Sequence, residues 1–482
     1  MQRVKFGTSG IRGLVIDLTD KVCYHATLSF LAYLKSIDMI QEGHAVGIGG
    51  DLRHSSPQIM NAIAAAVVES GYQPINCGFL PTPALALYGI RHGLPTMMVT
   101  GSHIPDDRNG IKFNTPKGEV LKADEQGILA QNPALNLALF DEQEQLFKTD
   151  YLPEIEATAQ RDYLQRYLDV FPSDALTGFK VGVYQHSSVA RDLLPILLAA
   201  LGAEVVYLGY SDKFISVDTE AIRPEDVLLA DKWTKEYGLD AIISTDGDAD
   251  RPLVSNELGE WLRGDVIGIL VARFLNADAV VTPVSSNSAL EKSQFFTTVK
   301  RTQIGSPYVI SAMQALTDKQ VVGYEANGGF LLNTDIELAG KVLAALPTRD
   351  AVLVPLCLLF EAKQKQCTLS QLFDELPARF TYSDRLKDFS SELSQSILKT
   401  LQVDSLEQVA ATFADLFNHS LPAVIAMDKT DGVRLTLNND EVVHLRGSGN
   451  APELRCYTEA ATYTAAKALN KQCMDIMVGW KI

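Results

Sequence analysis

The sequence of 482 residues lacks a surplus of positive charge. Lys and Arg together number 42 against 59 Asp and Glu, which gives a formal net charge of −17. Nucleic-acid backbones are bound mainly by clustered Lys and Arg, so this balance argues against a nucleic-acid partner. A small anionic ligand can still be bound where a few cationic side chains converge.

Long apolar runs are also missing. The N-terminal segment MQRVKFGTSGIRG has no apolar stretch of signal-peptide length. The most apolar segments, such as LLPILLAALGAEVV (193–206), are too short and too interrupted to cross a bilayer. We therefore expect a cytoplasmic protein that makes no membrane contact.

Cysteine is sparse. The six cysteines are scattered and form no C-x-x-C pair and no zinc-like cluster. Most of them have apolar neighbours, so we expect buried thiols in a reducing compartment.

A quiet internal repeat is present. VGIGGDLRHSS (46–56) and VGVYQHSS (181–188) each pass from a short apolar run to His-Ser-Ser, then to an amphipathic helical stretch, a glycine and a second apolar run. AVVTPVSSNSALEK (279–292) is a fainter third copy. Strand–helix–strand units of this kind place their strands parallel in a sheet covered by helices.

The length and the repeat together predict the domain organisation. A chain this long forms several domains of roughly 100–200 residues each. We predict an α/β fold with three repeated mixed-sheet α/β domains at 1–155, 156–265 and 266–375. The remainder, 376–482, reads as an α+β domain, with strands in AVIAMDKTDGVRLTL and EVVHLRG, a turn at Asp431-Gly432, and a helix in ELRCYTEAATYTAAKALNKQC.

The segment ISTDGDADRPLVSNE (243–257) contains three alternating carboxylates, Asp246, Asp248 and Asp250. In an extended loop they can converge on one hard cation. An EF-hand is one alternative, but Arg251 stands where that motif needs Gly and the preceding LDAIIST reads as a strand. A solvated acidic loop is another.

The segment EVVHLRGSGNAPELRCYTEA (441–460) pairs glycines with polar donors. A strand is expected to end at Leu445, and the backbone N–H groups of the following loop can approach an anion. Arg446 and Arg455 can add bidentate charge-assisted bonds. The segment is either a phosphate site or a turn with two surface arginines.

Two further segments carry polar residues in apolar surroundings. In VVGYEANGGFLL (321–332), Glu325 and Asn327 suit paired sugar hydroxyls, although a hairpin loop is the plainer interpretation. In MMVTGSHIPDDRNGIKF (97–113), Ser102 follows a strand, near the strand end where open α/β sheets bind ligands. The segment contains no G-x-S-x-G motif, and a turn or cap residue is the alternative.

Together these segments resemble the α-D-phosphohexomutase family, which includes phosphomannomutases, phosphoglucomutases and phosphoglucosamine mutases. FGTSGIRG (6–13) is similar to its N-terminal signature, TGSHIPDDRNGIK to its phosphoserine loop, and TDGDADR to its metal loop. GYEANGG stands at its sugar-specificity loop and RGSGNAPELR at its phosphate loop. The resemblance covers nearly the whole chain.

The resemblance implies a mechanism and a set of site residues. Ser102 would carry a phosphoryl group between hexose 1-phosphate and hexose 6-phosphate, through a hexose 1,6-bisphosphate that is both intermediate and activator. Mg²⁺ would be held by Asp246, Asp248, Asp250 and a phosphoserine oxygen on Ser102. The remaining implied residues are Arg12, His103, Lys112 and Arg251 beside the serine, Gly305, Ser306, Glu325 and Asn327 for the sugar, and Arg446, Ser448, Gly449, Asn450 and Arg455 for the phosphate.

The resemblance further implies four domains around a central cleft, in a monomer or homodimer. EANGG favours a mannose phosphate as substrate; glucose or glucosamine phosphate is the alternative. A sensor that binds sugar phosphate without catalysis is an alternative of a different class, and a calcium-binding structural protein is a third.

The sequence also departs from the family pattern. Gly101 replaces the usual Ala and Ile104 the usual Asn in the phosphoserine loop, and Ala249 replaces a Gly in the metal loop. Asn327 stands for the usual Ser of the sugar loop, and Ser306 stands where some members have His. Gly447 and Asn450-Ala451 replace the usual Pro and Thr-Glu of the phosphate loop.

Overall fold

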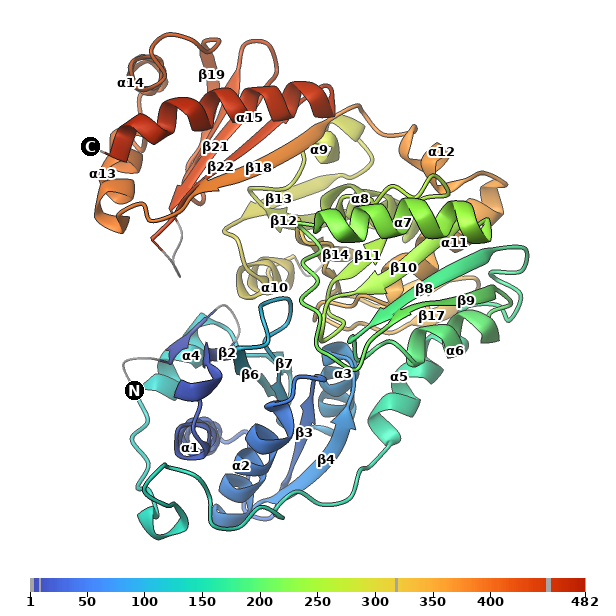
Figure 1. The fold of residues 1–482 in the computed structure, drawn as a ribbon, viewed down its shortest axis with the longest axis vertical. Helices are drawn as coiled ribbons and strands as arrows, with labels where there is room; N and C mark the ends of the chain where they lie inside the picture. Colours follow the sequence, from blue (N-terminus) through green and yellow to red (C-terminus); the bar gives the residue numbers. More distant parts are fainter. Residues whose placement is uncertain (1–3, 8–9, 317–319, 448–451, 482) are drawn as a thin grey trace. The chain divides into compact units, whose positions relative to one another are not determined.

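The computed structural model describes all residues except 1–3, 8–9, 317–319, 448–451 and 482. Figure 1 shows the chain as a series of α/β segments, and it divides into two compact units. The first unit comprises residues 1–280 and 306–373, and the second comprises 281–305 and 374–482. None of the described helices is both long enough and apolar enough to cross a membrane.

The first unit begins with a mixed sheet in the order β1-β2-β6-β5-β3-β4, with β7 added beside β6. β3 is parallel to β4 and β5, whereas β6 runs antiparallel to β5 and β2. The strands are β1 (Lys5–Phe6), β2 (Gly10–Leu14), β3 (Ala45–Gly50), β4 (Gln73–Phe79), β5 (Thr96–Val99), β6 (Arg108–Thr115) and β7 (Gly118–Glu119).

Helices cover both faces of this sheet. A Cβ on Gly49 would meet Leu85 of α3, and a Cβ on Gly50 would meet Met60 of α2. Because successive strand residues face opposite sides, α2 and α3 lie on opposite faces, and α1 packs beside α2. The helices of this segment are α1 (Asp20–Ser36), α2 (Ser56–Glu69), α3 (Thr82–His92) and α4 (Lys122–Leu129), followed by α5 (Thr158–Leu168).

A second sheet in the first unit has the order β11-β10-β8-β9. β8 is parallel to both β9 and β10, and β11 returns antiparallel to β10. Its elements are β8 (Lys180–His186), α6 (Leu193–Ala200), β9 (Glu204–Tyr210), α7 (Pro224–Tyr237), β10 (Ala241–Thr245) and β11 (Pro252–Val254).

The predicted repeat is confirmed. β3, α2 and β4 form one parallel strand–helix–strand unit, and β8, α6 and β9 form another. The third copy also has the expected element order, but its helix spans only five residues. Its elements are β12 (Ala279–Pro283), α9 (Ala289–Ser293) and β13 (Thr298–Thr302).

The rest of the first unit contains the predicted hairpin at 321–332, formed by β14 (Val321–Tyr324) and β15 (Phe330–Leu332). A smaller hairpin joins β16 (Ile336–Leu338) to β17 (Lys341–Leu343). The helices here are α8 (Gly264–Phe274), α10 (Ser306–Gln314), α11 (Leu353–Lys365) and α12 (Leu369–Phe373).

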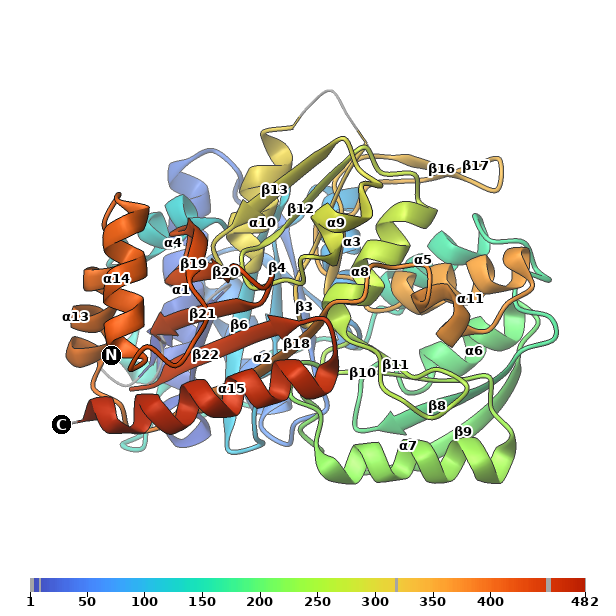
Figure 2. The ribbon, with the colours of Figure 1, turned by 90° about the horizontal axis from the view of Figure 1, so that it is seen from above.

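The second unit contains an antiparallel sheet in the order β18-β22-β21-β20-β19. Figure 2 shows α15 lying along β18 and β22. The elements are β18 (Phe380–Leu386), α13 (Ser391–Leu401), α14 (Leu406–Leu416), β19 (Val424–Asp428), β20 (Val433–Leu437), β21 (Val442–Gly447), β22 (Leu454–Ala460) and α15 (Tyr463–Met477).

Two predictions for this unit need correction. Residues 454–460, expected to be helical, form strand β22, because Leu454, Cys456 and Thr458 alternate inward with the period of a strand. The helix begins only at Tyr463, after the Thr462 side chain caps it. Strand β21 ends at Gly447, not at Leu445. The predicted turn at Asp431-Gly432 is confirmed, with Gly432 at a φ of 71°.

The cysteines agree with the sequence analysis. All six are free thiols, and five of them are buried.

Candidate functional site

Ser102 lies in the loop that follows β5. Its side chain is 1% exposed, and its Oγ donates a hydrogen bond to Oδ2 of Asp246 at 2.6 Å. Its backbone has a φ of 56°, in the left-handed region that costs an L-residue roughly 1–2 kcal/mol. The Thr100 hydroxyl accepts its N–H at 2.7 Å. Such strain persists only where neighbours fix it, so the loop holds this hydroxyl against the acidic loop.

Asp246, Asp248 and Asp250 lie between β10 and β11, and all three are fully buried. One ligand oxygen from each lies within 4.8 Å of the others, and no second group of this kind was found in the described part of the chain. Oδ1 of Asp248 and Oδ1 of Asp250 have no hydrogen-bond partner within the described residues. Buried carboxylate oxygens without partners are costly and are the ligands that hard divalent cations prefer. The residues therefore fit a Mg²⁺-like ion.

The Oδ2 atoms of Asp248 and Asp250, by contrast, accept hydrogen bonds. Lys112 Nζ on β6 donates to Oδ2 of Asp248 at 2.6 Å and to Oδ2 of Asp250 at 2.5 Å. Oδ2 of Asp248 also accepts the Thr82 hydroxyl at 2.6 Å. These contacts fix the two carboxylates and leave their Oδ1 atoms as the available ligands.

The electrostatics of the three carboxylates differ. Burial and the charges of Asp248 and Asp250 raise the pKa of Asp246 well above its usual range. Burial alone would also raise the other two, but Lys112 and Arg349 hold the pKa values of Asp248 and Asp250 below their usual range. A divalent cation would relieve the repulsion that raises the pKa of Asp246.

Three more predicted residues lie near the serine loop and the acidic loop. Arg251 Nε lies 3.6 Å from Oδ1 of Asp250, and that carboxylate raises the pKa of Arg251 against the effect of burial. Burial and the charge of Arg251 lower the pKa of Arg12 to about 10. The same two causes hold the pKa of His103 well below its usual range, and its Nδ1 lies 3.3 Å from Ser102 Oγ. The cations suit an anionic group on the serine, and His103 is neutral at pH 7.

The sugar loop candidates Glu325 and Asn327 lie in the turn between β14 and β15, and both are buried. Asn327 Oδ1 accepts the Gly329 N–H at 2.9 Å, so this oxygen fixes the turn. The Thr219 hydroxyl donates to the Asn327 carbonyl at 2.6 Å. The Glu325 carboxylate accepts from Arg349 Nη1 at 3.1 Å.

Arg349 belongs to the candidate site by its contacts, and the sequence analysis missed it. It is buried, and its Nη2 lies 2.7 Å from Oδ2 of Asp250 while its Nη1 contacts Glu325. One guanidinium thereby joins the metal loop to the sugar loop. The available signal was the charged pair Arg349-Asp350 within the otherwise mostly apolar segment 342–360, since charged residues are rarely buried without a partner.

Ser306 and Gly305 stand at the start of α10. Ser306 Oγ donates to Oε2 of Glu119 at 2.9 Å, and the other oxygen of Glu119 accepts the Thr348 hydroxyl at 2.6 Å. Gly305 has a φ of 131°, which favours glycine. The Ser306 hydroxyl is thus committed to a protein contact.

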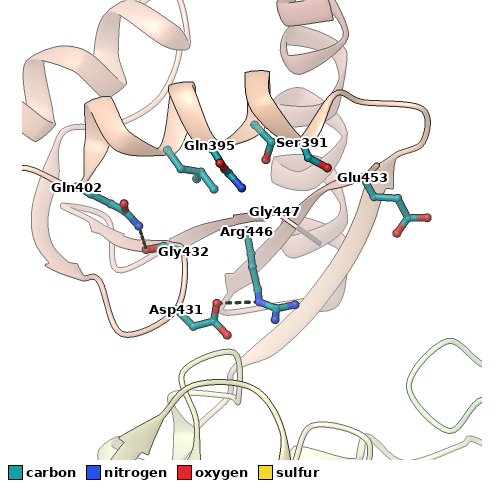
Figure 3. Close-up of a pocket in the computed structure, with 10 residues that line it drawn as sticks. Ser391, Gln395, Gln402, Asp431, Gly432, Arg446, Gly447 and Glu453 are labelled. Atoms are coloured by element: carbon teal, nitrogen blue, oxygen red, sulfur yellow. Dashed lines mark hydrogen bonds and ion pairs between the residues drawn. The ribbon is translucent and has the colours of Figure 1, made fainter. Parts of the chain in front are cut away.

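In the second unit, Arg446 lies at the end of β21 beside a pocket of about 220 Å³. Figure 3 shows its side chain pointing to Asp431, whose Oδ1 accepts from Arg446 Nε at 2.9 Å. A Cβ on Gly447 would lie 2.8 Å from Ser394 Oγ, so the usual proline would require the Ser394 side chain to move. The pocket is lined by Ser391, Ser394, Gln395, Leu398, Gln402, Asp431, Gly432, Arg446, Gly447 and Glu453. Ser448, Gly449 and Asn450 lie outside the described residues.

Three arginines stand in register across this sheet. Arg446 on β21 is paired with Arg455 on β22, which is paired in turn with Arg385 on β18. Directly opposed residues share one face, and like charges there repel. Glu453 compensates in part, at 3.5 Å from Arg455 and 3.7 Å from Arg385. An anion at this face would relieve the repulsion, and Arg385 was not foreseen from the sequence.

The EF-hand alternative is wrong. The acidic loop connects strand β10 to strand β11, with Thr245 paired to Pro252, and no helix precedes it. Glu257, the twelfth residue of the supposed motif, directs its carboxylate to Ser370. Ala249 has a φ of 56°, which explains why a glycine is usual at this position.

Family models match three segments of the chain. They describe phosphoglucomutase/phosphomannomutase α/β/α domain I at residues 3–135, domain II at 161–259 and domain III at 263–380. Together these matches span most of the sequence.

Individual proteins are similar over nearly the full length. A phosphomannomutase from Salmonella muenchen is 46% identical over 462 residues, which cover 95% of this chain and 92% of the relative. A phosphomannomutase from Sinorhizobium fredii is 41% identical and covers 98% of each chain. The crystal structure of a phosphoglucomutase/phosphomannomutase family protein from Burkholderia thailandensis aligns with a TM-score of 0.74, at 19% identity, covering 98% of this chain and 97% of the other.

Proposed function

Because this chain belongs to the phosphoglucomutase/phosphomannomutase family of phosphohexomutases, we propose that it interconverts mannose 1-phosphate and mannose 6-phosphate, with Ser102 as phosphoryl carrier. The carrier role rests above all on one observation. The buried hydroxyl of Ser102 lies 2.6 Å from Asp246, one of three carboxylates suited to a divalent cation.

The first transfer starts from a phosphorylated Ser102. A sugar hydroxyl attacks the phosphorus, the new P–O(sugar) bond forms, and the bond from phosphorus to Ser102 Oγ breaks. The sugar hydroxyl loses its proton, the serine oxygen leaves with the electron pair and gains one proton in exchange, and the product is a hexose 1,6-bisphosphate. The bisphosphate then presents its other phosphate to Ser102, and the reverse transfer restores the phosphoserine and releases the isomer.

The chain's own charges support this transfer. Phosphoryl transfer depends almost entirely on positioning and on stabilising charge on the transferring group. Arg12 and Arg251 supply fixed positive charge beside Ser102, and Lys112 stays protonated because Asp248 and Asp250 raise its pKa against the effect of burial. Mg²⁺ held by Asp246, Asp248 and Asp250 would neutralise charge on the phosphoryl oxygens. Burial and the charge of Arg251 lower the pKa of His103, whose Nδ1 lies 3.3 Å from Ser102 Oγ.

Substrate recognition is divided between two loops. Glu325 would accept hydrogen bonds from sugar hydroxyls, held in place by Arg349, and Asn327 shapes the turn that presents it. The Ser306 hydroxyl is hydrogen-bonded to Glu119. Gly305 and Ser306 would therefore contribute to sugar binding only by placing the start of α10. The substrate's own phosphate would bind Arg446 and Arg455, together with Ser448, Gly449 and Asn450.

We further propose domain boundaries near residues 155, 265 and 375. The family matches at 3–135, 161–259 and 263–380 support this division.

A coupled assay tests the substrate. Mannose 1-, glucose 1- and glucosamine 1-phosphate are compared, each with its matching 1,6-bisphosphate. We expect kcat/KM to be highest for mannose 1-phosphate, as the two phosphomannomutase relatives suggest. Comparable values for all three, or a preference for glucose or glucosamine, would overturn the mannose assignment.

Intact-mass analysis tests the carrier. Incubation with the bisphosphate should add one phosphate that maps to Ser102, and Ser102→Ala should abolish both the label and turnover while the fold is retained. An unlabelled protein that isomerises at full rate would overturn the role of Ser102. Labelling without any turnover would indicate a sensor in place of an enzyme.

A further inference from the structure

The turn after β3, residues Asp51–Ser56, lies against the loop that carries Ser102. This turn contains the first His-Ser-Ser copy of the internal repeat, to which the proposed mechanism gives no role. Its Arg53 is 1% exposed. Arg53 Nη2 donates to the Ser102 carbonyl at 2.8 Å and to the Ile104 carbonyl at 2.7 Å, and Nη1 donates to the Pro105 carbonyl at 2.9 Å. One side chain therefore fixes three carbonyls of the serine loop.

Asp51 completes this contact. Its Oδ2 pairs with Arg53 Nε at 3.1 Å and also accepts the Thr100 hydroxyl at 2.7 Å and the Gly101 N–H at 3.3 Å. The ion pair is fully buried. Asp51 thus binds the Thr100 hydroxyl and the Gly101 N–H of this segment, and Arg53 binds three of its carbonyls.

Phe214 and Gly101 also lie close to the Arg53 guanidinium. The Phe214 ring lies 3.9 Å from Arg53 Cζ. On another side, a Cβ on Gly101 would lie 2.7 Å from the same carbon, so the absence of a side chain at Gly101 leaves room for Arg53. Phe214 would also contact a Cβ on Gly247 in the metal loop, at 3.0 Å. Phe214, in the segment after β9, therefore lies against both Arg53 and the metal loop.

The second copy of the repeat also binds a loop, through other residues. At the end of β8, His186 Nε2 contacts the Thr245 carbonyl at 2.9 Å, and in the following turn Ser188 Oγ contacts Thr245 Oγ1 at 2.6 Å. The Val189 N–H donates to the Gly247 carbonyl at 3.1 Å. In both repeats, the turn after the first strand binds the functional loop that follows its parallel neighbour, β5 in one case and β10 in the other.

We propose that Arg53 is a positioning residue for phosphoryl transfer, which sets the place of Ser102 through the Ser102, Ile104 and Pro105 carbonyls. The inference rests on the proposed carrier role of Ser102. A planar guanidinium can bind several carbonyls at once, whereas an ammonium is a compact point charge. A displacement of about 1 Å at a reacting group can cost about 10²-fold in rate.

Arg53→Lys is the principal test variant, because it keeps a positive charge beside the buried Asp51 but cannot reach all three carbonyls. We expect the rate of phosphate transfer from the bisphosphate to Ser102, followed by rapid quench and intact mass, to fall about 10²-fold. kcat should fall by the same factor, with KM for the sugar phosphate unchanged. Arg91→Lys, at an exposed arginine on α3 that lies 3.9 Å from Asp162, is the matched control and should behave as wild type.

A melting curve separates positioning from stability. If Arg53→Lys is folded at the assay temperature and transfers phosphate at the wild-type rate, the inference is wrong. A loss of rate that only follows the unfolded fraction would also overturn it. If Arg53→Lys does not fold, Phe214→Leu is tested in its place. We expect its rate of phosphate transfer to Ser102 and its kcat to fall together. Unchanged values of both would overturn the inference. Failure of the carrier role itself would show separately, as wild-type protein that isomerises without a label on Ser102.

Discussion

Arg349 contacts Asp250 of the metal loop with one nitrogen, at 2.7 Å, and Glu325 of the sugar loop with another, at 3.1 Å. The adjacent Asp350 accepts hydrogen bonds from the Tyr163 and Tyr167 hydroxyls, and it also accepts the Val352 N–H at 3.1 Å, near the start of α11. The contacts of Asp350 hold the neighbouring backbone of Arg349 in place. The Arg349 guanidinium therefore couples the position of the metal loop to that of the sugar loop.

Replacing Arg349 should impair metal activation and sugar binding together. Lysine lacks the forked guanidinium whose two nitrogens contact Asp250 and Glu325 separately, so for Arg349→Lys we expect kcat/KM to fall about 10–100-fold, which corresponds to about 1.4–2.7 kcal/mol. The measurement is kcat and KM at a series of Mg²⁺ concentrations, with the exposed Arg161→Lys as control. A loss of thermal stability with unchanged kinetics would contradict this prediction.

Arg385 should contribute to phosphate binding. It stands opposite Arg455 in the sheet register, is half-exposed, and has no part in the hydrophobic core of its unit. For Arg385→Met we expect KM to rise about 5–10-fold with kcat unchanged, since the net contribution of a typical hydrogen bond is about 0.5–1.5 kcal/mol. High salt should reduce the difference between variant and wild type. The exposed Lys467→Met on α15 provides the comparison, and an unchanged KM in Arg385→Met would refute the role.

Magnesium should stabilise the protein through the three aspartates. At a concentration 100 times its dissociation constant, a ligand of the folded state adds about 2.7 kcal/mol. We expect the melting temperature to rise with added Mg²⁺ and to return after EDTA. Asp248→Asn should lose this response, whereas Asp231→Asn on the exposed face of α7 should keep it. An Asp248→Asn protein that still responds fully would place the ion elsewhere.

Ala249→Gly should make the protein more stable. Ala249 has a φ of 56°, a conformation that glycine adopts without penalty, so the free energy of unfolding should rise by up to about 1 kcal/mol. Loss of the buried methyl group offsets part of this gain. The same exchange at Ala64, inside helix α2, should lower the free energy by about 1 kcal/mol. Equal destabilisation at both positions, measured by thermal melting, would show that the left-handed backbone is not under strain.

Acid should destabilise the second unit through His444. Burial lowers the pKa of His444 to about 4, and its Nε2 contacts the Asp431 carbonyl at 2.7 Å. The unfolded chain has a histidine pKa of about 6.5, so between these values it binds a proton that the folded state does not, and stability falls by about 3 kcal/mol as the pH drops from 6.5 to 4.

His444→Gln keeps an N–H donor and removes the titration. Unfolding followed from pH 4.5 to 7.5 should therefore show a flatter pH dependence in the variant than in wild type. Burial also lowers the pKa of His186, in the first unit, to about 4. His186→Gln should therefore flatten the dependence of stability on pH as well. Parallel curves for wild type and both variants would contradict the assignment.

The sequence predicted those site residues whose position depends on one strand and the loop after it. Ser102 follows β5 and the aspartates follow β10, so an apolar run ending in polar residues was sufficient to place them. The two parallel repeat units were also predicted, because their strands and helix are consecutive in the chain.

The sequence did not predict features that depend on distant partners. Arg349 meets Asp250, 99 residues away in the chain (349 − 250), and Arg385 is placed only by strand pairing. The segment 454–460 was mistaken for a helix because Glu and Ala favour helices, whereas pairing with both β18 and β21 outweighs that weak preference. Arg53 contacts backbone carbonyls, and such contacts leave no pattern of residue types in the sequence.

The register of β6 ties the candidate site to the packing of its sheet. Lys112 stands opposite Gly10 on one side and Met98 on the other, and a Cβ on Gly10 would lie only 2.0 Å from the Ile111 carbonyl. A slip of one residue would turn every side chain of this strand to the opposite face. The Lys112 ammonium would then leave the acidic loop, and Ile111 and Phe113 would leave the apolar core in which they are buried. A molecule that misplaces this lysine is therefore also badly packed, so the packing that makes the sheet stable is what delivers the ammonium to the acidic loop.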